Sequence, residues 1–159
     1  MSGNGNEDYH WRETYYILFD AARRPTLTQV ERILGELSGH IRLENLTANE
    51  DGQFESLVLQ SPDDHAALEI SYETGEAVIE QAVELAKQLK AEAEPQQLTQ
   101  LLKASARLDV MHFEQVVRGG FGEDEDEMLD PSCLLMTVDA LRELTGGIAV
   151  DPASGAILP

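Results

Sequence analysis

The chain has few basic residues, one cysteine and no long apolar run. Eleven lysines and arginines stand against 30 aspartates and glutamates, so the formal net charge is −19 over 159 residues. A field of that sign repels phosphate backbones and anionic membranes before any contact forms. We therefore expect no nucleic-acid partner and no membrane partner, and the basic residues are too scattered to form a nucleic-acid-binding face.

The low cysteine count and the missing targeting signals bear on location. Cys133 is the only cysteine and cannot form an internal disulfide. No apolar run approaches the roughly 18 residues that span a bilayer. Residues 1–8 have neither the basic region nor the apolar core of a secretory signal. These features predict a cytoplasmic protein with a reduced cysteine.

Familiar motifs of catalysis and metal binding are missing too. Neither G-x-S-x-G nor H-E-x-x-H occurs, and the four histidines lack zinc-ligand spacing. An EF-hand alignment with Gly52 at its sixth position puts Val58, which has no ligand atom, where a bidentate glutamate is required. The glycine-rich stretch 119–122 leads into five acids at 123–127, which would repel a phosphate. We expect no metal and no cofactor, and the balance leans away from an enzyme.

What the chain does contain is regular apolar patterning, with 42% hydrophobic residues, which predicts a folded core. Alternating or β-branched stretches predict strands, and apolar residues at three- and four-residue spacing predict helices. The expected strands span 14–19, 41–47, 54–60, 67–72, 107–117, 148–150 and 156–158, and the expected helices span 26–38, 74–90, 95–102 and 131–145. In the last region, a strand over 133–138 followed by a helix from 139 is an alternative.

This order of elements predicts an α+β fold, with helices packed on one face of a mainly antiparallel sheet. A ferredoxin-like core with additions is the first topology that we consider. We expect a flexible acidic segment over 1–12 and a single domain over 13–159, with a mobile acidic loop near 119–130. The strand-and-turn pattern of residues 145–152 is similar to endings found in bacterial domains.

Two pairs of residues are candidate ligand-binding groups. Arg23 and Arg24 form the only adjacent basic pair and precede a helix N-terminus, whose free N–H groups attract anions. The plainer interpretation is that they offset neighbouring acids. His112 and Glu114 are two apart on an expected strand, so they share a face, and a carboxylate can orient an imidazole for general-base chemistry. A histidine simply hydrogen-bonded within the sheet is the plainer alternative.

Cys133 has no partner signature, and the apolar residues that follow it predict a small core residue rather than a nucleophile.

The leading hypothesis from the sequence is a non-enzymatic binding or protein-interaction module of the bacterial cytoplasm. A basic protein is the expected partner because opposite charge speeds encounter, and a second copy paired through an open sheet edge is another option. The alternative is a small-molecule-binding protein or enzyme with a site near His112 and Glu114 or near Arg23 and Arg24. Imitation of nucleic acid by rows of carboxylates ranks last, because the densest acidic run is expected to be mobile.

Overall fold

A computed structural model of the chain describes residues 9–37, 40–62, 65–115 and 132–158. The expected mobile acidic loop near 119–130 lies entirely outside these residues, as do residues 1–8 of the expected flexible segment. Residues 9–12, by contrast, belong to the first strand. The elements are β1 (Tyr9–Phe19), the 3₁₀ helix η1 (Ala21–Arg23), α2 (Leu27–Gly35), β2 (Arg42–Ala48), β3 (Phe54–Ser61), β4 (Ala66–Thr74), α3 (Glu76–Gln88), α4 (Pro95–Lys103), β5 (Ala106–Gln115), α5 (Ser132–Thr145), β6 (Ile148–Asp151) and β7 (Ala156–Ile157).

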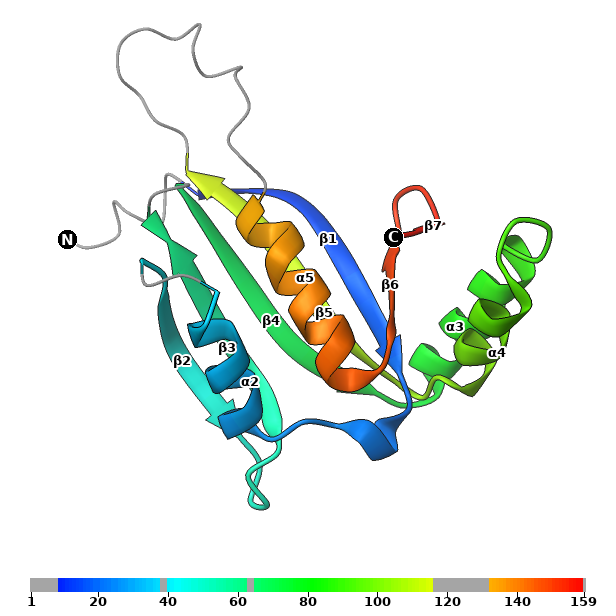
Figure 1. Cartoon of the computed structure of the whole chain (residues 1–159), viewed down its shortest axis with the longest axis horizontal. Coiled ribbons are helices and arrows are strands. Elements are labelled where there is room, and N and C mark those ends of the chain that lie inside the picture. Colours follow the sequence, from blue (N-terminus) through cyan, green and yellow to red (C-terminus); the bar gives the residue numbers. More distant parts are fainter. Residues whose placement is uncertain (1–8, 38–39, 63–64, 116–131, 159) are drawn as a thin grey trace, which may run out of the picture.

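The strands form one seven-stranded antiparallel sheet in the order β2-β3-β4-β5-β1-β6-β7, which confirms the expected α+β class (Figure 1). Strands β2, β3 and β4 form a meander, and β5 lies between β4 and β1, which suits a strand with apolar residues on both faces. The ferredoxin-like core is not confirmed. Three consecutive strands follow α2, and β5 rather than any of them lies beside β1.

Local chemistry sets most of the helix ends. Thr26 begins α2 with a capping box, because its Oγ1 accepts from the Gln29 backbone N–H while Gln29 Oε1 accepts from the Thr26 N–H. The start of α3 differs from the prediction. Gly75, not Thr74, precedes that helix, because the Thr74 hydroxyl instead donates to the Ser105 carbonyl at 2.9 Å.

The alternative strand over 133–138 is wrong, since α5 is continuous from Ser132 to Thr145.

The expectation that helices pack on one face of the sheet is wrong. Ile17 and Phe19 belong to the large core beneath α2 and α5, whereas Leu18 belongs to a second core beneath α3 and α4. Neighbouring residues of a strand point to opposite faces, so the two helix pairs cover opposite faces. Figure 1 shows α2 and α5 across the sheet and α3 and α4 paired at one end of it.

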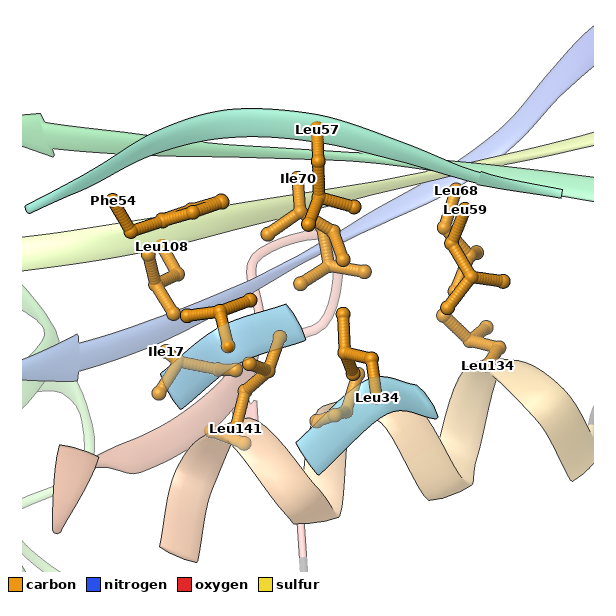
Figure 2. Close-up of a cluster of buried hydrophobic side chains, with 14 of the residues drawn as sticks. Ile17, Leu34, Phe54, Leu57, Leu59, Leu68, Ile70, Leu108, Leu134 and Leu141 are labelled. Carbon is orange, nitrogen blue, oxygen red and sulfur yellow. The ribbon is translucent and has the colours of Figure 1, made fainter. Parts of the chain in front are cut away.

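The large core lies between the sheet and the pair α2 and α5. Figure 2 shows Leu34 of α2 and Leu134 and Leu141 of α5 directed towards side chains of the sheet, which include Leu57 and Leu59. These residues are at most 2% exposed. Burial of a leucine side chain contributes about 1.5–3 kcal/mol, so this layer holds α2 and α5 against the sheet.

Candidate functional site

The two adjacent arginines have different surroundings. Arg24 Nε and Nη2 donate to the Phe54 carbonyl oxygen at 3.2 and 2.8 Å, and its guanidinium lies 3.8 Å from the centroid of the Tyr72 ring. Arg23 is exposed, and its guanidinium lies over Gly146 at the end of α5. Arg24 therefore ties the connection between β1 and α2 to strands β3 and β4. A ligand could recruit this guanidinium only by displacing those contacts, so an anion site here stays a prediction.

His112 and Glu114 lie on the same face of β5, as predicted, and a third residue joins them from β1. Glu13 is paired across from His112 in the sheet, and its Oε2 lies 2.6 Å from His112 Nδ1. His112 Nε2 lies 3.9 Å from Glu114 Oε2, and Glu114 Oε1 lies 3.3 Å from Arg12 Nε. An ionised carboxylate only accepts hydrogen bonds, so the His112 tautomer with a proton on Nδ1 is the one that can donate to it.

This cluster has the composition of an acid–base site but little access. The His112 side chain is 4% exposed, and each ring nitrogen faces a carboxylate. Burial, followed by the charges of Glu13 and Asp151, raises the pKa of neighbouring Tyr15. These contacts fit a polar group satisfied inside the sheet. Catalysis by His112 and Glu114 stays a prediction.

Further observations limit the chemistry of the described parts of the chain. No three histidine, cysteine, aspartate or glutamate side chains in these ranges are arranged to hold a metal ion. Cys133 is partly buried and packs against the large core. A shallow, open hollow lies between Leu89 and Ala93 on one side and Ile157 on the other, away from the candidate residues.

The sheet has a second surface that the sequence did not reveal. Beyond α3 and α4, the strands carry two rows of directly opposed residues on the face that holds Leu18. We call this surface the open face and define it by Trp11, Phe113, Ala67 and Gln60 in the outer row and by Thr14, Met111, Glu69 and Val58 in the inner row.

The open face is apolar and accessible at the same time. Trp11 is 56% exposed, and its indole N–H donates to the Thr14 hydroxyl at 2.9 Å, which holds the ring against the sheet. Phe113, Met111 and Val58 are half-buried. None of these side chains belongs to the core beneath α3 and α4. Half-exposed aromatic and methionine side chains on one surface are typical of protein contact sites.

Glu69 gives the open face a negative centre. It is exposed on β4 and lies between Met111 of β5 and Val58 of β3. Among the described residues, no ion pair neutralises its carboxylate. A cation brought by a partner would therefore meet a carboxylate that lies between the apolar side chains of Met111 and Val58.

A cluster of polar contacts around Arg107 borders the inner row of the open face. Arg107 pairs with Asp109 at 2.5 Å, donates to Gln81 Oε1 of α3 at 2.6 Å and lies 4.2 Å from the centroid of the Tyr16 ring. One guanidinium thus joins β5, β1 and α3. The end of the face that α3 covers is fixed, and no described helix packs over the rows beyond it.

No family model, no curated protein and no solved structure matches the chain. Among the described helices, none is long and apolar enough to cross a membrane. The functional argument consequently depends on the geometry and charge of the residues themselves.

Proposed function

We propose that this protein is a non-catalytic binding module whose partner is another protein with a positively charged contact surface. The observation that carries the proposal is the open face, where Glu69 lies between Met111 and Val58 and has no ion-pair partner among the described residues. The net charge of −19 adds a long-range attraction for cationic surfaces.

The alternative of an enzyme or small-molecule-binding protein has less support. His112 is enclosed by two carboxylates, and Arg24 is engaged by a carbonyl oxygen and an aromatic ring. The hollow near Leu89 is shallow and holds neither residue. Both His112 and Arg24 are engaged by neighbouring groups of the fold, so the open face gives the better support for a protein-binding role.

Pairing of two copies through a sheet edge is also less favoured. The edge strand β2 is irregular, with breaks in its pairing register on both sides of Thr47 and a positive φ of 54° at Asn45. Such irregularities impede edge-to-edge pairing. At the other edge, β7 has only two residues, and β6 pairs with β1 only over Tyr16–Leu18, so residues 9–15 of β1 are the longer edge on that side of the described sheet. Light scattering over a range of concentrations should give the mass of a monomer, and a dimer mass would restore this option.

A salt-dependent binding experiment tests the proposed function. The full chain is immobilised and exposed to extract of the cells that produce it, and bound proteins are eluted with salt and identified. The purified partner is then titrated by calorimetry at two ionic strengths. We expect a basic protein whose affinity falls as salt rises, because salt screens exposed charges. Recovery of no salt-eluted partner, or an affinity independent of salt, would contradict the proposal.

A further inference from the structure

We propose that the open face is the docking surface and that its occupant is a cationic amphipathic helix of the partner. This inference rests on the proposed function. It adds the surface that binds the partner, the helical form of the bound segment and the residue, Glu69, that pairs with its positive charge. The contact residues that carry it are Trp11, Met111, Phe113, Val58 and Glu69.

The backbone of the sheet decides between a helix and an extended segment. Along the open face, β3, β4 and β5 are paired on both sides, so their N–H and C=O groups are used within the sheet. Strand β1 is paired there with β5, and β6 joins its other side only over Tyr16–Leu18. A segment lying on the open face can contact only side chains. An extended segment would leave its own backbone groups unpaired against an apolar surface, whereas a helix satisfies them internally.

The dimensions of the open face suit a helix. Four strands spaced about 4.8 Å apart span roughly 14 Å, and a helix with its side chains is about 10–12 Å wide. The same face already accepts helices, because α3 and α4 pack Val78, Ala82 and Leu101 over the end that contains Leu18. An incoming helix would occupy the rows that this pair leaves uncovered.

Charge decides between an external partner and a second copy. Two copies of this chain would each bring a net charge of −19 and would set one Glu69 near the other. Like charges disfavour that arrangement. A helix with lysine or arginine beside its apolar stripe would instead pair with Glu69 and place aliphatic side chains on Phe113 and Met111. Trp11 offers its ring to the same cation or to apolar groups.

The single tryptophan makes the test direct, because the intrinsic tryptophan fluorescence comes from Trp11 alone. The probe is a synthetic helical peptide with a leucine stripe flanked by lysines. A second peptide keeps the stripe and replaces each lysine with glutamate. We expect the lysine peptide to bind and shift the Trp11 emission to the blue as water leaves the ring, and the glutamate peptide to cause no shift.

Surface variants then identify the docking residues. Glu69→Lys and Phe113→Thr should each weaken binding of the lysine peptide by about tenfold, as expected for central contact residues. The matched control is Leu135→Ser, which removes a 48% exposed leucine from α5 on the opposite side of the sheet and should leave the affinity unchanged. Glu69 is exposed, so its variant tests the surface even if Phe113→Thr unfolds the protein.

The outcomes separate this inference from the proposed function. If the lysine peptide does not bind, or if Glu69→Lys binds it as tightly as the wild type, the docking inference is wrong. Concentration-dependent dimerisation that Glu69→Gln strengthens would show that a second copy occupies the face, and this would also overturn it. A natural basic partner that binds with salt-dependent affinity despite Glu69→Lys and Phe113→Thr would leave the proposed function standing and place its surface elsewhere.

Discussion

Replacement of Arg24 by alanine tests whether this arginine serves the fold. The change removes two hydrogen bonds to the Phe54 carbonyl, at 3.2 and 2.8 Å, and the contact with the Tyr72 ring at 3.8 Å. A hydrogen bond involving a charged group contributes about 1.5–3 kcal/mol, and a cation–π contact adds about 0.5–1 kcal/mol at an exposed site. Both depend on one half-buried side chain, so we expect the free energy of unfolding to fall by about 2 kcal/mol.

The neighbouring arginine supplies the matched control. Arg23 is exposed and lies over Gly146, so Arg23→Ala should change the free energy of unfolding by less than about 0.5 kcal/mol. Arg24→Lys should fall between Arg24→Ala and the wild type, because lysine keeps the charge but lacks the planar fork of donors.

Urea unfolding followed by circular dichroism measures these differences, with the dependence on urea concentration expected to stay constant across the variants. Arg24→Ala within about 0.5 kcal/mol of the wild type would refute the reasoning. Equal losses in Arg23→Ala and Arg24→Ala would also refute it, since the two side chains have unlike contacts.

Four further substitutions test other parts of the structure by the same unfolding measurement. Gly147→Ala should lower the free energy of unfolding by about 1–3 kcal/mol, because the new Cβ would lie 2.6 Å from the Leu18 carbonyl oxygen of β1. Gly35→Ala has open space around its Cβ and should raise the free energy of unfolding by up to about 1 kcal/mol. A more stable Gly147→Ala variant would contradict this reasoning. The pKa of Tyr15 is raised in the folded protein, so its contribution to the free energy of unfolding is complete below a pH of about 10 and is lost as the pH rises through the folded pKa. Tyr15→Phe should therefore lose less stability in alkali than the wild type. An equal alkaline loss in the variant and the wild type would contradict this reasoning. Glu13→Gln should cost about 1 kcal/mol by weakening the 2.6 Å contact with His112, and no measurable loss would show that this contact contributes little.

The local elements could be predicted because their signals lie within a few residues. The capping box of Thr26 and Gln29 and the Asp-Gly turn at Gly52 are signals of this kind, and both form in the structure, with Gly52 at a φ of 80°. Pro95 stands at the start of α4, where its missing N–H costs nothing. Such features depend on neighbours in the chain and not on the tertiary fold.

The placement of the helices could not be predicted in the same way, because it depends on which strand face meets which helix. The sequence did contain one signal. Ile17, Leu18 and Phe19 are three consecutive apolar residues, and all three are buried in the structure. A strand with one wet face would alternate, so this run indicated that both faces are covered at that end of β1.

The candidate sites were predicted in part for the same reason. His112 and Glu114 share a face because they are two apart on one strand, and the structure confirms this. Glu13 is 99 residues from His112 in the sequence, so only the pairing of β1 with β5 brings it there. Trp11 was assigned to a flexible segment, and the open face was therefore missed.

The most direct test of the account is to map the binding of the lysine peptide onto the protein by NMR. Backbone amide shifts are recorded while the peptide is added to the full chain. The account predicts that the largest shifts centre on Trp11, Glu69 and Phe113, with little change in α2 and α5. Shifts centred on the β2 edge, or on α2 and α5, would contradict it.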